Sequence, residues 1–179
     1  MNPQTGYIIL WQGHTWLSKA IRQIMAYWNW VRGKQQGFSF SHAATMYDKV
    51  TEGEAISLRY KLTSFSEEYQ NKKGWVMIGP IIPMTEEQIR ATKEMITKLE
   101  REVKVYQFWN FLQWPVYVAT FGGVNLFGKG GIKAVYCYEA AARIVNAAYP
   151  GTFKYPEIMD SYSLWTLLDT GWEIKIDNR

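Results

Sequence analysis

The chain has 179 residues, of which 47% are hydrophobic and 20% charged, as expected for one globular domain with its own core. This composition excludes a disordered chain, a collagen-like repeat and a coiled coil as the dominant state. The formal net charge of +4 comes without a block of like charge and gives little support for nucleic-acid binding. A single Cys excludes an intramolecular disulfide, and with only two His a metal cluster would have to be built from carboxylates. We therefore expect one domain over residues 1–179 and predict no metal or cofactor site.

The sequence shows neither an export signal nor a membrane-spanning segment. The first residues lack the positive charge of a signal peptide, and the apolar run at 7–11 is too short for one. The most apolar later stretch, 111–127, contains Pro and Gly and is shorter than the roughly 20 residues that a spanning helix needs. The sequence thus predicts a soluble protein made in the cytoplasm.

Hydrophobic periodicity predicts the elements of the first half of the chain. Apolar runs or alternating apolar residues between Gly, Pro and Asp are typical of strands, and apolar residues three and four apart are typical of helices. We expect strands at 7–11, 38–47, 54–60 and 75–82, and a helix at 16–31.

The second half carries stronger helix signals. Thr85 to Gln88 fits a capping box, and the apolar stripe after it runs to about residue 107. An aromatic segment at 108–120, possible as a helix that Pro115 must kink or end, leads into a Gly-rich loop at 122–131. The Ala-rich segment 138–148 predicts a helix, and a short final helix is expected at 161–168. Together these elements predict an α+β domain.

Cys137 is the one candidate nucleophile. It follows the short apolar run 134–136 and opens the Ala-rich helix. The first turn of a helix presents free N–H groups and the positive end of the dipole, which favour the nucleophilic thiolate. The same N–H groups suit the oxyanion that forms when a carbonyl is attacked. The alternative is a small hydrophobic core residue, the more common fate of a lone Cys.

His42 is the candidate base for that nucleophile. It lies within the predicted strand 38–47 and is flanked by Ser41 and Ala43, whose small side chains leave space for a substrate. The alternative is a buried His bonded to the backbone. His14 lies in a loop, and we rank it well behind His42.

An imidazole that acts as a base usually has a third group that fixes its tautomer. Glu54 opens the strand expected after that of His42, so antiparallel pairing could bring the two side chains together. Glu52 is the local competitor, and Asp48 lies nearer but in the expected turn. The alternative for each is a solvated loop carboxylate.

Four short motifs in order resemble a known family. They are Gly6-Tyr7-Ile8-Ile9-Leu10, Ser41-His42-Ala43-Ala44, Glu54-Ala55 and Val135-Tyr136-Cys137-Tyr138-Glu139. This order resembles the circularly permuted papain-like proteins of the YiiX/YaeF-like group, which are related to the NlpC-type cysteine peptidases. The resemblance covers about residues 6–170 and implies an antiparallel sheet or partial barrel packed against helices. In unpermuted relatives the Cys precedes the His.

The resemblance also implies roles for three residues. Cys137 matches the nucleophile, His42 the base and Glu54 the residue that orients the imidazole. Two positions depart from the pattern, because Tyr7 stands where the family has Asp and Tyr138 stands where it has Ser. Neither belongs to the triad, so the departures bear on substrate preference and on the entrance to the site.

The implied function is a cysteine hydrolase that cleaves an amide bond, with cell-wall peptide as the substrate class. An enzyme without an export signal would reach the wall by another route, such as phage lysis or a virion. One alternative is an acyltransferase or lipid hydrolase of the lecithin:retinol acyltransferase-like type. Another is a binding module that keeps the fold without the activity.

Two further features of the sequence bear on possible ligands. The helix 16–31 carries several aromatic and basic residues and could hold an acyl chain or lie on a membrane, but packing on the sheet is the simpler interpretation. The segment Gly128 to Gly131 lacks the spacing and the following Ser or Thr of a phosphate-binding loop, which excludes that interpretation.

Overall fold

The computed structural model describes residues 3–31, 33, 40–56, 59–65, 73–103, 105–106, 134–156, 159 and 161–179. Its main feature is a six-stranded antiparallel sheet with the order β4-β3-β2-β1-β5-β8. The strands are β1 Ile8–Trp11, β2 His42–Met46, β3 Thr51–Ile56, β4 Arg59–Ser64, β5 Trp75–Pro80 and β8 Trp172–Asn178. A separate parallel pair consists of β6 Val105–Tyr106 and β7 Ala134–Val135.

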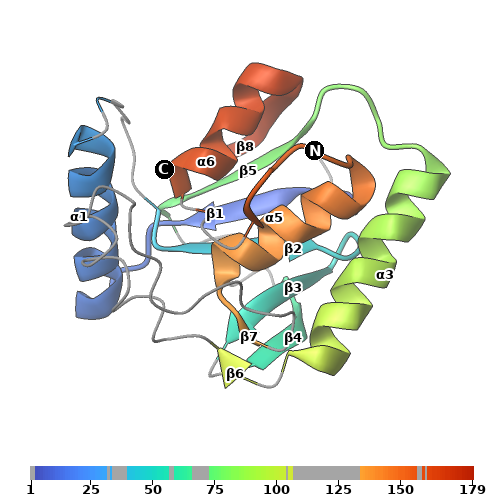
Figure 1. Cartoon of the computed structure of the whole chain (residues 1–179), viewed down its shortest axis with the longest axis horizontal. Coiled ribbons are helices and arrows are strands. Elements are labelled where there is room, and N and C mark those ends of the chain that lie inside the picture. The colour runs from blue at the N-terminus through green and yellow to red at the C-terminus, as the bar shows by residue number, and fades with distance from the viewer. Residues whose placement is uncertain are drawn as a thin grey trace.

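Four α-helices accompany the sheet in the described part of the chain. They are α1 Trp16–Val31, α3 Glu86–Glu102, α5 Cys137–Ala148 and α6 Ser161–Trp165, and a 3₁₀ turn, η2 Thr166–Thr170, follows α6. Helix α5 lies across the sheet with α3 beside it, and α1 stands at the opposite side of the molecule (Figure 1). The mixed α+β class expected from the sequence is confirmed.

The sheet separates two hydrophobic clusters, because successive strand residues point to opposite faces. Ile8 and Leu10 of β1 belong to the larger cluster, which also contains the buried apolar residues of α3 and α5. Ile9 belongs to the smaller cluster, with Trp75 and Met77 of β5. The central strand β1 is thus buried on both faces, which explains its unbroken apolar sequence.

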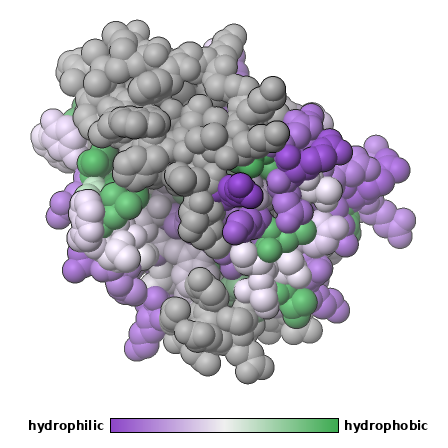
Figure 2. Space-filling view, turned by 90° about the horizontal axis from the view of Figure 1, so that it is seen from below, coloured by the Kyte–Doolittle hydropathy of each residue, from purple (hydrophilic) through white to green (hydrophobic). Residues whose placement is uncertain are grey.

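Helix α3 begins at the predicted capping box. The Thr85 hydroxyl accepts a hydrogen bond from the Gln88 N–H at 3.3 Å, and the Gln88 side chain accepts one from the Thr85 N–H at 2.9 Å. The helix ends at Glu102, earlier than expected, because Val103 is extended and leads into β6. Charged side chains line its outer face, on the side of the molecule where Figure 2 shows hydrophilic residues gathered.

One predicted strand was wrong, and the strands β6, β7 and β8 were not predicted. The segment 54–60 is divided between β3 and β4, which pair antiparallel up to Ile56 opposite Arg59. Because Glu54 pairs with Lys61, Glu54 and Tyr60 lie on opposite faces of the sheet, whereas an unbroken strand would place both on one face. The sequence between the two strands contains no Gly or Asn, the residues that usually mark a hairpin. Strand β8, which pairs with β5, was not predicted.

Other expectations differ in their limits or lie outside the described residues. Strand β2 is shorter than the predicted 38–47, of which residues 38–39 are not described. The expected aromatic segment 108–120 and Gly-rich loop 122–131 also fall outside the described residues. None of the helices that the structure describes is both long and apolar enough to cross a membrane.

The close packing of Tyr60 against Gly53 yields a prediction about stability. A Cβ at Gly53 would lie 2.9 Å from Cζ of Tyr60, closer than such atoms approach in proteins. Gly53→Ala should therefore lower the free energy of unfolding by about 1–3 kcal/mol, the usual cost of overpacking. Urea denaturation measures the loss. Adding Tyr60→Phe removes the hydroxyl oxygen that would lie nearest to the new Cβ and should restore part of the lost stability. A double variant as unstable as Gly53→Ala would contradict the packing argument.

Candidate functional site

The pairing of β2 with β3 brings His42 and Glu54 together. Ala44 lies directly opposite Glu54, and His42 lies two residues before Ala44 on the same face of the sheet. His42 and Glu54 are therefore diagonal neighbours, within reach of long side chains. The Nε2 atom of His42 lies 3.2 Å from Oε2 of Glu54.

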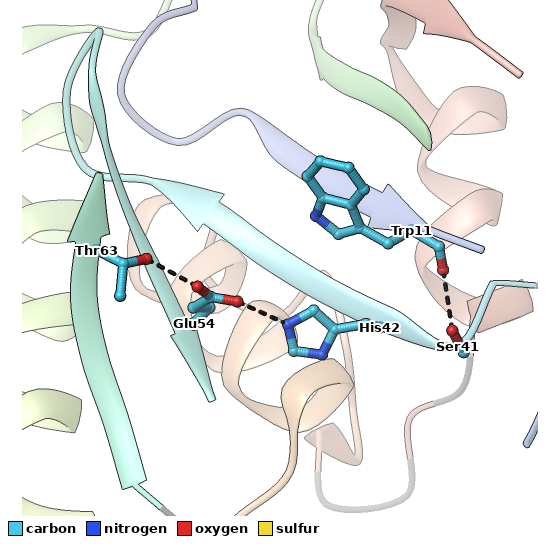
Figure 3. A network of polar contacts seen from close by, with 5 residues as sticks. All are labelled: Trp11, Ser41, His42, Glu54 and Thr63. Atoms are coloured by element: carbon cyan, nitrogen blue, oxygen red, sulfur yellow. Dashed lines mark hydrogen bonds and ion pairs between the residues drawn. The ribbon is translucent and has the colours of Figure 1, made fainter. Parts of the chain in front are cut away.

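Thr63 extends this contact to a third strand. The Thr63 hydroxyl donates a hydrogen bond of 2.8 Å to Oε1 of Glu54, so the two oxygens of one carboxylate bind partners on β2 and β4 (Figure 3). Thr63 lies opposite Glu52 in the register and is thus diagonal to Glu54 as well. No pattern in the sequence pointed to Thr63, since the hairpin that carries it was not predicted.

Cys137 reaches this group from α5, which contacts β2 and β3. It is the first residue of the helix, and its side chain forms a hydrogen bond with that of His42. Because Nε2 of the imidazole faces Glu54, Nδ1 is the nitrogen left to face the sulfur. Cys137 is only 1% exposed, whereas the His42 side chain is 26% exposed, so the imidazole is the more accessible partner.

The start of α5 brings backbone N–H groups to the candidate site. Tyr136 occupies the N-cap position and forms no side-chain capping bond. Its carbonyl accepts the first helical hydrogen bond, from Ala140, so the N–H groups of the first turn point toward the end of the helix that carries Cys137. These groups and the helix dipole favour negative charge on the sulfur or on a bound oxygen.

The surroundings of His42 stabilise its protonated form. Burial acts against the charge, but the negative charge and hydrogen bond of Cys137, followed by those of Glu54, outweigh it and raise the pKa of His42 from 6.5 to about 10. The structure therefore favours an imidazolium at neutral pH, and a positive charge beside Cys137 favours the thiolate form of its side chain. Such a pair holds a nucleophile and a proton donor side by side.

A second carboxyl group lies on the same face of β3. Glu52 is 1% exposed, and its Oε2 atom has no hydrogen-bond partner among the described residues. Burial, followed by the charge of Glu54, raises the pKa of Glu52 from 4.5 to about 8, against the effect of His42. At neutral pH Glu52 thus favours the uncharged form, and Glu54 is the carboxylate that faces the imidazole.

The other residues weighed from the sequence lie apart from this group. Asp48 accepts hydrogen bonds from the N–H groups of Val50 and Thr51 in the turn before β3, and these bonds hold its pKa below the usual value. His14 is exposed in the loop between β1 and α1. No group of three His, Cys, Asp or Glu side chains in the described part of the chain is placed to hold a metal ion.

Aromatic residues lie next to the imidazole and on α1. Trp11 is the direct partner of His42 in the register, and its ring lies 5.5 Å from that of Trp75. On α1, Ile21 and Met25 are buried in the core, as the packing interpretation requires. The outer face of the helix carries three exposed aromatic side chains, Trp16 (80% exposed), Tyr27 (56%) and Trp30 (74%).

Comparison of the chain with family models, with curated proteins and with solved structures finds no match. The function must therefore be argued from the geometry of the site, and the family resemblance adds to that argument as an interpretation of the motifs.

The buried acid Glu52 predicts how stability changes with pH. Its carboxyl loses its proton near pH 4.5 in the unfolded chain and near pH 8 in the folded one. The folded state binds more protons between these values, so the free energy of unfolding should fall as the pH rises through this window, by a few kcal/mol in order of magnitude. Glu52→Gln should remove this part of the decline, as measured by urea denaturation at several pH values.

Glu94 supplies a matched control for this measurement, because its side chain is 71% exposed. Glu94→Gln should leave the pH dependence unchanged. A Glu52→Gln variant with the same pH dependence as the parent protein would show that Glu52 is not held uncharged in the folded state.

Proposed function

We propose that the protein is a cysteine hydrolase that cleaves amide bonds, with Cys137 as nucleophile, His42 as acid and base, and Glu54 as the residue that orients His42. The observation that carries the proposal is the position of one imidazole, which bonds the only thiol of the chain through one side and a buried carboxylate through the other. A nucleophile, a base and an orienting group in this relation form the arrangement that activates a thiol.

The first half of the reaction forms a thioester. The Cys137 thiolate attacks the carbonyl carbon of the substrate, and the oxyanion that results lies near the N–H groups at the start of α5. The imidazolium of His42 gives its proton to the amine as the C–N bond breaks. Glu54 stabilises the imidazolium before this transfer and holds the ring in place through its bond to Nε2.

The second half releases the acid. His42, now neutral, removes a proton from a water molecule as its oxygen attacks the thioester carbonyl. The C–S bond then breaks, and the sulfur leaves as a thiolate beside the imidazolium. The site returns to its starting charge state, and the net reaction is hydrolysis of one amide bond by one water molecule.

The proposal also covers the fold family and the substrate class. A His on β2 that precedes a Cys at the start of α5 is the chain order of the circularly permuted papain-like group that the motifs resemble. On that resemblance we propose the permuted papain-like fold and cell-wall peptide as the substrate class.

One observation favours a second candidate, which is acyl transfer or lipid hydrolysis. The exposed aromatic side chains of Trp16, Tyr27 and Trp30 on α1 offer an apolar surface that an acyl chain could use. The same protein should be tested on peptide amides and on acyl esters. Faster turnover of the esters would favour the second candidate.

We expect removal of the His42 imidazole to lower the reactivity of the Cys137 thiol strongly. Because the chain has a single Cys, alkylation by iodoacetamide followed by intact-mass measurement reports Cys137 alone. His42→Ala should slow alkylation at neutral pH and lower amide turnover by roughly two or more orders of magnitude, the scale of general base catalysis. His14→Ala is the matched control and should keep most of the alkylation rate and most of the amide turnover of the parent protein. The reverse ranking would contradict the assignment of the base.

The alkaline limit of activity provides a test of Glu54. The leaving amine needs the proton of His42, so turnover should fall as the pH rises through the pKa of His42, about 10. Glu54→Gln removes the charge that helps to hold the proton and should move this limit to lower pH. Its turnover should be lower than that of the parent protein but above that of Cys137→Ala. An unchanged alkaline limit would exclude Glu54 as the orienting group.

A further inference from the structure

Two buried tyrosines flank Cys137 and anchor the start of α5 to different parts of the molecule. The Tyr138 hydroxyl donates a hydrogen bond of 2.6 Å to the carbonyl of Phe40, and the Tyr136 hydroxyl donates one of 2.6 Å to the carbonyl of Met159. Both side chains are buried, and their rings meet edge to face. Both anchors are hydrogen bonds of 2.6 Å from a Tyr hydroxyl to a backbone carbonyl, but they connect α5 to different segments of the chain.

The Tyr138 anchor ends beside the base. Phe40 lies two residues before His42, and the N–H of Ser41 between them donates a hydrogen bond of 2.7 Å to the carbonyl of Trp11 on β1. Phe40 is fully buried, and its ring packs against Trp165. The carbonyl that receives the Tyr138 bond is therefore part of a fixed segment that leads directly into His42.

The Tyr136 anchor ends elsewhere. Met159 precedes α6 and is far from β2 in the chain. The hydrogen bond that Tyr136→Phe removes therefore ends outside the segment 40–42, whereas the one that Tyr138→Phe removes ends within it.

We infer that Tyr138 is a positioning residue that sets the approach of the Cys137 sulfur to the His42 imidazole, an inference that rests on the proposed function. Cys137 and Tyr138 are consecutive in the first turn of α5, so one residue presents the thiol while the next ties the helix to the strand that presents the base. The hydrogen bond of Tyr138 to Phe40 and that of Cys137 with His42 both join the first turn of α5 to the segment 40–42. A displacement of about 1 Å between reacting groups can cost roughly a hundredfold in rate, so one such bond has a large effect on the site.

This position also departs from the family that the motifs resemble, which has Ser there. A Ser side chain is too short to replace the phenol, so the bond to Phe40 is a feature of this chain's own residues. Tyr138 thus acts through Cys137 and His42 rather than on a substrate.

The test compares Tyr138→Phe with Tyr136→Phe. Each variant removes one hydroxyl and one buried hydrogen bond while keeping the ring, so the two should lose similar stability in urea. Only Tyr138→Phe should slow alkylation of Cys137 by iodoacetamide at neutral pH. We expect a decrease of about tenfold, which is less than the roughly hundredfold loss for a displacement of about 1 Å between the reacting groups. Tyr136→Phe should stay within about twofold of the parent protein, because the contact between thiol and imidazole is kept.

The imidazole itself gives the readout that a purely structural role would not change. With only two His in the chain, the NMR signals of His42 and His14 can be followed separately through a pH titration. Tyr138→Phe should lower the pKa of His42 from about 10, because a more distant thiolate stabilises the imidazolium less, whereas Tyr136→Phe should not. Equal effects of the two variants on alkylation and titration, or no effect of Tyr138→Phe on either, would overturn the inference.

Failure of the proposed function would look different. If His42→Ala leaves the alkylation rate of the parent protein unchanged, the thiol and imidazole are not coupled at all, and the proposed function fails whatever the tyrosine variants do. If His42→Ala slows alkylation and Tyr138→Phe does not, the proposed function stands and the role of Tyr138 is wrong.

Discussion

The antiparallel register between β2 and β3 is the constraint on which the candidate site depends. With Ala44 opposite Glu54, the imidazole of His42 and the carboxylate of Glu54 lie on one face as diagonal neighbours. A shift of one residue would turn Glu54 to the other face and leave the imidazole without its partner. Gly53 contributes to this register, because the ring of Tyr60 packs where a side chain would otherwise stand.

Two carboxyl groups on one strand take opposite electrostatic roles because their partners differ. Glu54 has His42 on one oxygen and Thr63 on the other. Glu52 is more deeply buried than Glu54, but its Oε2 atom has no partner among the described residues, and the charge of Glu54 acts on it as a like charge. Like charges that share a buried region disfavour double ionisation, so an uncharged Glu52 allows the negative charge to remain on the residue that faces the imidazole.

The helix and the sheet contribute different parts of the site. The start of α5 provides the thiol and backbone N–H groups, while β2, β3 and β4 provide the imidazole and its supports. A site divided in this way works only if the two layers are held in a fixed relation. The buried hydrogen bond from Tyr138 to Phe40 joins them close to where the chemistry is proposed, and the bond from Tyr136 to Met159 joins the helix to a different region.

The sequence by itself determined the α+β class, the capping box at Thr85, the placement of Cys137 at the start of a helix and the choice of His42 over His14, because local periodicity and neighbouring residue types carry these features. It did not show the hairpin between β3 and β4, since the sequence between the two strands contains no Gly or Asn, the residues that usually mark a hairpin. The sequence therefore did not point to Thr63. It also did not show that Glu52 is buried and favours its uncharged form, because that state depends on neighbours distant in the chain. The sequence favoured Glu54 over Glu52 and Asp48 as the partner of His42, but only the tertiary structure shows the contact, because strand register is fixed by pairing and burial across the whole sheet rather than by any one segment.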